Sequence, residues 1–166
     1  NTLVGAHGQQ EYFAPQVQAI WLKDIQRGES TRLSEAEFVV DTVDKWSRVI
    51  ELAQQHFPNL KLVYNTTRTY AGYSTWGLSP EPFAWRYGRA VRDTIQQQIV
   101  GTRLGAVAPV LWGPYFWADG LIPRSDGLTW RCGDFQSDGV HPGPSGLVKT
   151  TAMLHNHFST DPTACR

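Results

Sequence analysis

Short apolar segments alternate with longer amphipathic ones along the chain, and this alternation is the strongest constraint on its fold. The clearest amphipathic segment begins with a capping box, in which Ser34 is followed three residues later by Glu37. Apolar residues then recur at spacings of three and four along one helical face: Val39, Val43, Trp46, Ile50, Ala53 and Phe57. This pattern predicts a helix over 34–57, which the dipeptide Pro58-Asn59 ends.

Two further helices and several strands complete the predicted order of elements. Segment 81–99 carries apolar residues four apart and is followed by Gly101, and segment 145–158 has a similar apolar face. Segments 17–22, 60–64 and 106–112 are short apolar runs typical of buried strands, and residues 1–5 resemble a strand that runs into a glycine turn. Strands separated by helices indicate an α/β fold in which right-handed βαβ units build a parallel sheet.

Length, charge and composition narrow the class of protein. With 166 residues the chain is predicted to form a single domain over 1–166. Its 15 basic and 15 acidic residues cancel, which argues against nucleic acid as a partner, and its apolar runs are too short to span a membrane. The 7 tryptophans and scarce Met suit an extracellular or periplasmic protein. Cys132 and Cys165 are compatible either with one bridge or with two free thiols.

An Asp-x-x-His sequence in a Gly- and Pro-rich loop is the main candidate for chemistry. Asp138 lies three residues before His141, so on a turn its carboxylate can hold the imidazole by one nitrogen and leave the other nitrogen as a base. Two simpler roles remain open, since Asp138 can form an Asx turn with Gly139 and His141 can cap a turn. The loops 5–10, 23–28, 65–77 and 113–141 follow predicted strands, and we expect them to gather at one edge of the sheet.

The glycine turn at 5–9, the βαβ order and the sequence from Ser137 to Pro142 before the last helix together resemble the SGNH hydrolase family, also called the GDSL esterase and lipase family. Stretches 57–62, 68–73, 80–83 and 112–120 are similar to a subset known mainly from microbial genome sequences. The resemblance covers nearly the whole chain. It implies a three-layer α/β/α sandwich with a central parallel sheet, the flavodoxin-like SGNH fold, lacking its first strand because the chain is truncated at its N-terminus.

The resemblance also implies roles for individual residues. Asp138 would orient His141, His141 would act as the general base, and Gly8 would donate its backbone N–H to an oxyanion. The family's nucleophilic serine follows its first strand in a Gly-Asp-Ser-like turn, and this sequence contains no such turn. The family's second oxyanion donor is an Asn, whose place is taken by Trp21-Leu22-Lys23-Asp24. Lys23 is the candidate replacement donor, against the alternative of a solvated strand-end lysine.

Other candidate residues have a packing role as the alternative to a functional one. Arg68 and Tyr70 are expected either to line a pocket or to stabilise a packed loop, and Trp112 and Tyr115 either to stack on a sugar or acyl group or to pack. Ser145 is expected to cap the last helix rather than to attack a substrate. The Asn65-Thr66-Thr67 sequon faces the predicted active edge, which favours a structural role. His155 and His157 lie two apart on a helix and therefore do not share a face for a metal.

The predicted function is that of an ester hydrolase, either a carbohydrate esterase or a lipase-like enzyme, that works by a Ser/His/Asp relay without a cofactor or metal. Its substrate would be a small-molecule or glycan ester. Two alternatives follow from the missing serine turn. One is a non-catalytic module that binds a glycan or a protein, and the other is a structural subunit of an extracellular assembly. In the latter, an exposed sheet edge pairs with a partner chain or with a missing N-terminal segment.

Overall fold

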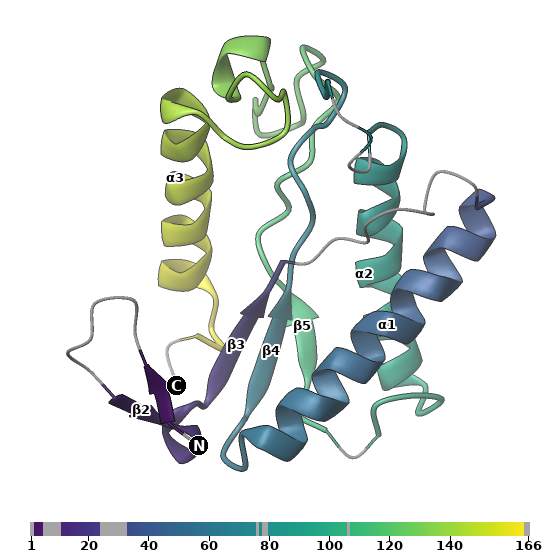
Figure 1. Cartoon of the computed structure of the whole chain (residues 1–166), viewed down its shortest axis with the longest axis vertical. Helices are drawn as coiled ribbons and strands as arrows, with labels where there is room; N and C mark the ends of the chain where they lie inside the picture. Colours follow the sequence, from purple (N-terminus) through teal and green to yellow (C-terminus); the bar gives the residue numbers. More distant parts are fainter. Residues whose placement is uncertain are drawn as a thin grey trace.

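The structure, a computed structural model, describes residues 2–4, 11–23, 33–75, 77, 80–105 and 107–164. Its centre is a parallel sheet of order β3-β4-β5, formed by Ala19–Leu22, Leu62–Asn65 and Val110–Trp112. Helices α1 (Glu35–His56) and α2 (Phe83–Ile99) cover one face of this sheet, and α3 (Pro144–Thr160) lies beside the other (Figure 1). The predicted α/β class and parallel sheet are confirmed.

Helix α1 begins where its capping box predicts. The Glu37 carboxylate accepts a hydrogen bond from the Ser34 backbone N–H at 2.9 Å, and Ser34 Oγ accepts one from the Glu37 N–H at 3.3 Å. The apolar face of α1 packs on α2 and the sheet, with Trp46 stacked on Tyr87 at 5.8 Å between ring centroids. The predicted helix over 34–57 is therefore confirmed to within one residue at each end.

The last strand of the sheet is shorter than the predicted strand over 106–112. Glutamine side chains from the two covering helices bind the backbone at the start of this strand: Ala108 N donates to Gln54 Oε1 at 2.8 Å, and Val110 N donates to Gln98 Oε1 at 2.7 Å. Pro109 has no N–H to donate, although its carbonyl accepts from Val63 N at 2.9 Å. Regular pairing therefore begins only at Val110.

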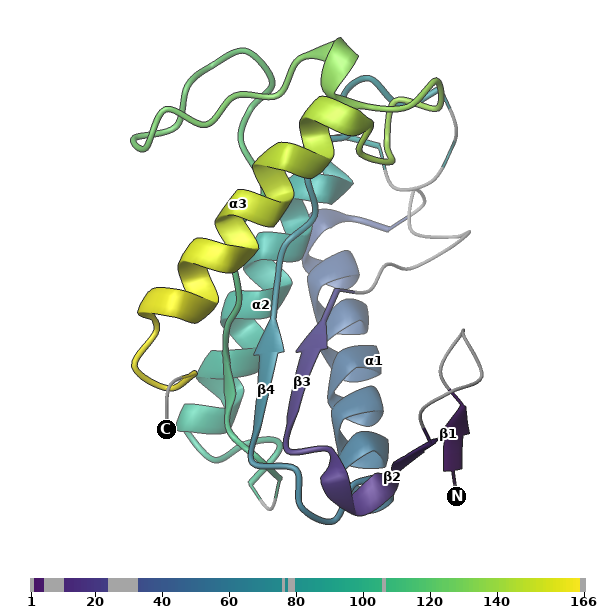
Figure 2. The same cartoon turned by 90° about the vertical axis from the view of Figure 1, so that its left-hand side faces the viewer.

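The N-terminal strand forms a separate hairpin instead of joining the parallel sheet. Strand β1 (Thr2–Val4) pairs antiparallel with β2 (Glu11–Phe13). Figure 2 shows β1 and β2 near the start of β3, at the end of the sheet opposite the long loops. The prediction that residues 1–5 contain a strand is confirmed for Thr2–Val4, but its partner is a neighbouring segment and not the central sheet. Within the described residues β3 is thus an edge strand.

The segments that follow β4 and β5 lie together beyond the carboxyl ends of the strands (Figure 2). We call residues 66–75 and 113–143 the loop layer. Its apolar centre consists of Ala118, Trp130 and Phe135, against which Tyr70, Tyr73 and Leu128 pack. Two of the four predicted loops therefore gather as expected, whereas loop 5–10 and most of loop 23–28 lie outside the described residues.

Candidate functional site

The Asp-x-x-His sequence lies at the tip of a tight hairpin formed by residues 134–143, the dyad hairpin. Its two arms are joined by an antiparallel bridge between Phe135 and Pro142 and by a hydrogen bond of 2.7 Å from Gln136 N to His141 O. The turn needs Gly139, whose φ of 69° lies in the left-handed region. A Cβ at this position would also meet the Tyr73 carbonyl oxygen at 1.9 Å, so the neighbouring loop approaches closely.

Asp138 and His141 form the predicted pair, which we call the dyad. His141 Nδ1 lies 2.5 Å from Asp138 Oδ2, and Asp138 Oδ1 accepts the backbone N–H groups of Val140 and His141 at 2.9 and 3.0 Å. The hydrogen bond from His141, together with the two backbone N–H groups, lowers the pKa of Asp138 to about 2. At neutral pH the carboxylate is therefore ionised and can only accept, so His141 Nδ1 donates and Nε2 is left as a base.

The Asx turn and the dyad coexist, because they use different oxygens of the same carboxylate. The His141 side chain is 64% exposed, so its ring is accessible to a substrate. What fixes the ring is the pair of backbone hydrogen bonds that hold its carboxylate partner.

The loop after β4 lies directly against the dyad hairpin. Thr75 donates to the Asp138 carbonyl oxygen through its backbone N at 3.1 Å and its Oγ1 at 3.3 Å. The Tyr73 hydroxyl donates to the Trp130 carbonyl oxygen at 3.1 Å, and the rings of Tyr70 and Tyr73 meet edge to face with centroids 5.3 Å apart. Tyr70, predicted as a pocket or packing residue, thus packs beside the dyad hairpin through Tyr73.

Glu81, which the sequence did not single out, organises the start of α2. Its carboxylate accepts three hydrogen bonds, from Ala71 N at 3.0 Å, Trp85 N at 3.2 Å and Trp117 Nε1 at 2.9 Å. It therefore joins the two long segments of the loop layer to α2. The available signal was an acidic residue at the first position of the predicted helix 81–99, where it complements the positive end of the helix dipole.

Two cationic residues follow neighbouring strands of the sheet. Lys23 comes directly after β3, and Arg68 comes three residues after β4. Arg68 is 5% exposed, and burial lowers its pKa, against the opposing effects of Tyr87 and Glu81. Surrounding protein atoms and the charge of Arg68 also lower the pKa of Lys23, although its side chain keeps a large exposed fraction. Both predicted candidates thus lie at the carboxyl edge.

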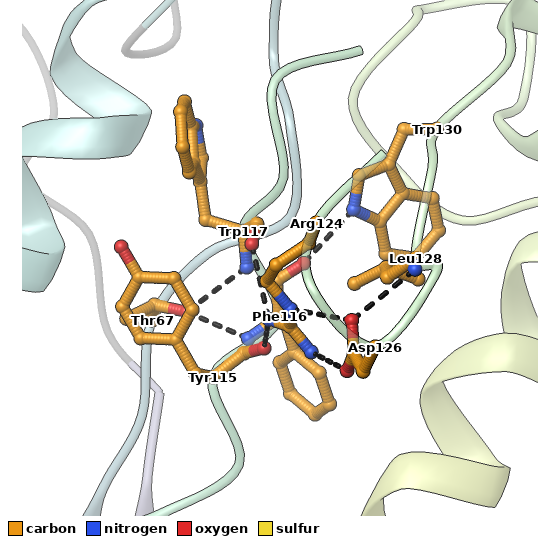
Figure 3. Close-up of polar contacts among 8 residues, drawn as sticks. All are labelled: Thr67, Tyr115, Phe116, Trp117, Arg124, Asp126, Leu128 and Trp130. Atoms are coloured by element: carbon orange, nitrogen blue, oxygen red, sulfur yellow. Dashed lines mark hydrogen bonds and ion pairs between the residues drawn. The ribbon is translucent and has the colours of Figure 1, made fainter. Parts of the chain in front are cut away.

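Thr67 holds the loop that follows β5. Its Oγ1 accepts the backbone N–H groups of Phe116 at 2.8 Å and Trp117 at 3.3 Å, as Figure 3 shows. Trp130 Nε1 donates to the Phe116 carbonyl oxygen at 2.9 Å. These contacts bury Phe116 and place the backbone of the aromatic segment 112–117 against β4.

Arg124 holds the same loop from its other side. It donates to the carbonyl oxygens of Tyr115 and Trp117 and forms an ion pair with Asp126 (Figure 3). The Tyr115 ring packs against Arg124 and against Gly88, where a Cβ would lie 3.0 Å from the tyrosine hydroxyl. Trp112 is 38% exposed. Of the two predicted aromatic candidates, Trp112 therefore offers the more accessible ring, and Tyr115 is mainly packed.

Ser145 does not cap the last helix, which corrects the sequence prediction. The N-cap is Gly143, with Pro144 at the first helical position, and no side chain caps the helix. Ser145 Oγ instead donates to Asp134 Oδ1 at 2.9 Å and to the Gly133 carbonyl oxygen at 3.1 Å. Proline sets the helix start without a side-chain acceptor, which frees the serine for this contact.

The remaining candidates from the sequence are Gly8, the two cysteines, the glycosylation sequon, a nucleophilic serine and a metal site. Gly8 and Cys165 lie outside the described residues, and Cys132 is an exposed free thiol. Asn65 is fully buried, which prevents attachment of a glycan, and both polar atoms of its side chain are without a hydrogen-bond partner among the residues that the structure describes. Among the described residues, no hydrogen bond joins a serine hydroxyl to the His141 ring, and no group of three His, Cys, Asp or Glu side chains could hold a metal ion.

Comparison of the chain with protein-family models, with curated proteins and with solved structures finds no match in any of the three. None of the helices in the described part of the chain is long and apolar enough to cross a membrane. The fold and the site together describe an α/β protein with a parallel sheet and an Asp–His pair at the carboxyl edge of that sheet.

Proposed function

We propose that this chain carries the acid–base half of an SGNH-type ester hydrolase site, in which Asp138 orients His141 and His141 is the general base. The observation that supports this most is the 2.5 Å contact between His141 Nδ1 and Asp138 Oδ2 on a hairpin beyond the carboxyl edge of a parallel sheet. The exposed ring leaves Nε2 available to a reacting hydroxyl.

In this reaction Nε2 takes the proton of a serine hydroxyl as its oxygen attacks the ester carbonyl carbon. The ionised Asp138 stabilises the imidazolium that forms, and His141 then returns the proton to the departing alcohol. The same base next activates water, which releases the acid from the acyl-enzyme. The serine itself comes, in this proposal, from a segment outside the described residues, on a further strand beside β3.

The finer parts of the proposal concern the surroundings of the dyad. Lys23, at the end of β3, is the proposed oxyanion donor, whereas Gly8 lies in sequence between β1 and β2, which are at the opposite end of the sheet from the dyad (Figure 2). The exposed Trp112, with the partly exposed Tyr115 and Tyr70, forms the proposed wall for a small-molecule or glycan ester, and the buried Arg68 supports the segment that carries Tyr70. The proposed complete domain is the flavodoxin-like three-layer sandwich of an extracellular or periplasmic enzyme.

A second candidate is a module that binds a glycan or a partner chain without catalysis. Two observations on the described residues favour it. No serine hydroxyl is bonded to His141, and β3 is an edge strand beside a groove of about 410 Å³. Trp21, Tyr64 and Phe158 are among the residues that line this groove. An edge strand offers unpaired backbone groups that an added strand can bind.

Hydrolysis of p-nitrophenyl acetate, with labelling by a fluorophosphonate, separates the two candidates. For a hydrolase, His141→Gln should lower the rate by about 10²–10⁴-fold, the usual contribution of a general base. His155→Gln is the matched control, because His155 is an exposed histidine on α3 outside the dyad hairpin, and it should leave the rate unchanged. Protein that neither hydrolyses the ester nor takes the label would contradict the hydrolase and favour the binding module.

A further inference from the structure

A second polar cluster, buried beneath the dyad hairpin, lies apart from the Asp138–His141 pair. Its centre is Asp134, which is 5% exposed. Asp134 Oδ1 accepts from Ser145 Oγ at 2.9 Å, and Asp134 Oδ2 accepts from Lys149 Nζ at 2.5 Å and from Arg131 N at 2.8 Å. Three donors, one from the segment before the hairpin and two from α3, thus meet at one carboxylate.

The Asp134 carboxylate keeps all of its hydrogen bonds only when Ser145, Lys149 and the Arg131 N–H are all in place. Burial by itself would raise the pKa of Asp134, yet the hydrogen bonds from Lys149, Arg131 N and Ser145 outweigh it and leave the pKa below its ordinary value. Loss of the ammonium would leave a buried carboxylate without its ionic partner, which is the costly way to change a buried ion pair. The position of each of these side chains therefore depends on the presence of the others.

Asp134 is also the first residue of the dyad hairpin. Its backbone carbonyl accepts from Gly143 N at 2.8 Å, which closes the base of the hairpin. The same carbonyl approaches the first turn of α3 so closely that a Cβ on Gly146 would lie 2.1 Å from it. The bridge from Phe135 to Pro142 and the bond from Gln136 to His141 continue from this base toward the dyad.

Lys149 extends the contact to the rest of the loop layer. Besides Asp134, its Nζ donates to the Thr129 carbonyl oxygen at 2.9 Å and lies 5.4 Å from the centroid of the Trp130 ring. One side chain on the second turn of α3 therefore touches both the segment before the hairpin and the hairpin base. Lys149 does not contact His141, so a change at Lys149 reaches the ring through the backbone of residues 134–143 or through Trp130 and Tyr73.

We infer that Asp134 and Lys149 are positioning residues, which fix the base of the dyad hairpin against α3 and thereby hold the His141 ring on the Asp138 carboxylate. The inference concerns how firmly the His141 ring is held in the protein without substrate. Its relevance to catalysis rests on the proposed hydrolase function. Neither residue touches the His141 ring, and both act through the closed hairpin and the loop segments that contact it.

The test is ¹H–¹⁵N NMR of the His141 ring, assigned by its loss in His141→Gln. In the unaltered protein the Nδ1 proton should give a low-field resonance protected from exchange with water. Lys149→Met keeps the aliphatic stem and removes the charge, and it should broaden or abolish this resonance, while Lys149→Arg restores it in part. Lys45→Met is the matched control, since Lys45 pairs with Asp41 at 2.7 Å on the exposed side of α1.

A folded Lys149→Met protein with an unchanged His141 resonance would overturn the inference. If this variant does not fold, as judged by circular dichroism, Ser145→Ala decides, because it removes one hydrogen bond from Asp134 and keeps the ion pair. An unchanged proton exchange rate in Ser145→Ala then overturns the inference, and a faster exchange supports it. Because the resonance is read without substrate, an inactive protein with the expected NMR result contradicts only the hydrolase function.

Discussion

The core between the covering helices and the sheet is stabilised in a different way from the loop layer. Between α1, α2 and the sheet, the core consists of apolar and aromatic side chains such as Phe38, Trp46 and Tyr87, which are almost fully buried. In the loop layer the apolar centre is small, and buried polar side chains join segments that are distant in sequence: Thr67 binds the backbone of Phe116 and Trp117, and Asp134 binds side chains of α3. The first region supplies a rigid platform, and the second sets the position of the dyad through single hydrogen bonds.

The largest expected effects come from removing one tryptophan in each region. Trp46→Ala and Trp130→Ala should each cost about 3–5 kcal/mol, because both rings are almost fully buried. Urea unfolding followed by circular dichroism gives the two free energies. Amide hydrogen exchange then separates the regions: Trp130→Ala should accelerate exchange in 113–143 selectively, and Trp46→Ala should not. Equal exchange in both variants would show that the platform and the loop layer unfold as one unit.

Thr67 tests whether the loop layer depends on a single acceptor. Thr67→Val keeps the shape and removes Oγ1, which leaves the N–H groups of Phe116 and Trp117 without their acceptor. The expected cost is about 1–3 kcal/mol, with faster exchange of the Phe116 amide. Thr67→Ser is the control and should retain most of the stability. A Val variant as stable as the Ser variant would contradict the role of this hydroxyl.

A smaller effect is expected at the start of α1, on the platform side. Ser34→Ala removes the capping box and should cost about 1 kcal/mol in the free energy of unfolding. Ser34→Asp retains an acceptor for the Glu37 N–H and should be close to the unaltered protein. The His141 resonance should be the same in both variants. A shift of that resonance in Ser34→Ala would mean that the two regions are coupled.

The smallest expected effect is a loss of stability at acidic pH, and it comes from Asp138 in the loop layer. The pKa of Asp138 is lowered from 3.8 to about 2, with His141 as the main cause. Because the folded pKa is depressed, the stabilisation is complete above the ordinary value and is lost as the pH falls toward 2. Titration of the Asp138 carboxyl ¹³C resonance measures this. In His141→Gln the midpoint should rise toward 3.8, and a midpoint near 3.8 in the unaltered protein would contradict the pairing.

The same contrast explains which features the sequence could predict. The helix over 34–57 was predictable because Ser34 and Glu37 interact locally, and the Asp138–His141 contact because its residues are three apart. The start of β5 was not, since Gln54 and Gln98 reach it from two helices. These contacts depend on tertiary packing and leave no local pattern.

The buried cluster at the base of the dyad hairpin was equally hidden. Asp134 and Lys149 are 15 residues apart, and their contact depends on the direction in which α3 leaves the hairpin. Glu81 likewise binds Ala71 and Trp117, which lie on separate loops. Contacts of this kind join segments that are far apart in the sequence, so residues of the loop layer were predictable as candidates but their partners were not.

The tautomer of His141 tests the central claim most directly. Its two ring nitrogens are distinguished by ¹⁵N NMR at neutral pH. If Asp138 holds the ring as the geometry indicates, Nδ1 carries the proton and Nε2 is unprotonated, and Asp138→Asn weakens this preference toward the mixture of an ordinary histidine. A ring protonated mainly at Nε2, with no change in Asp138→Asn, would contradict the claim that Asp138 prepares His141 as a base.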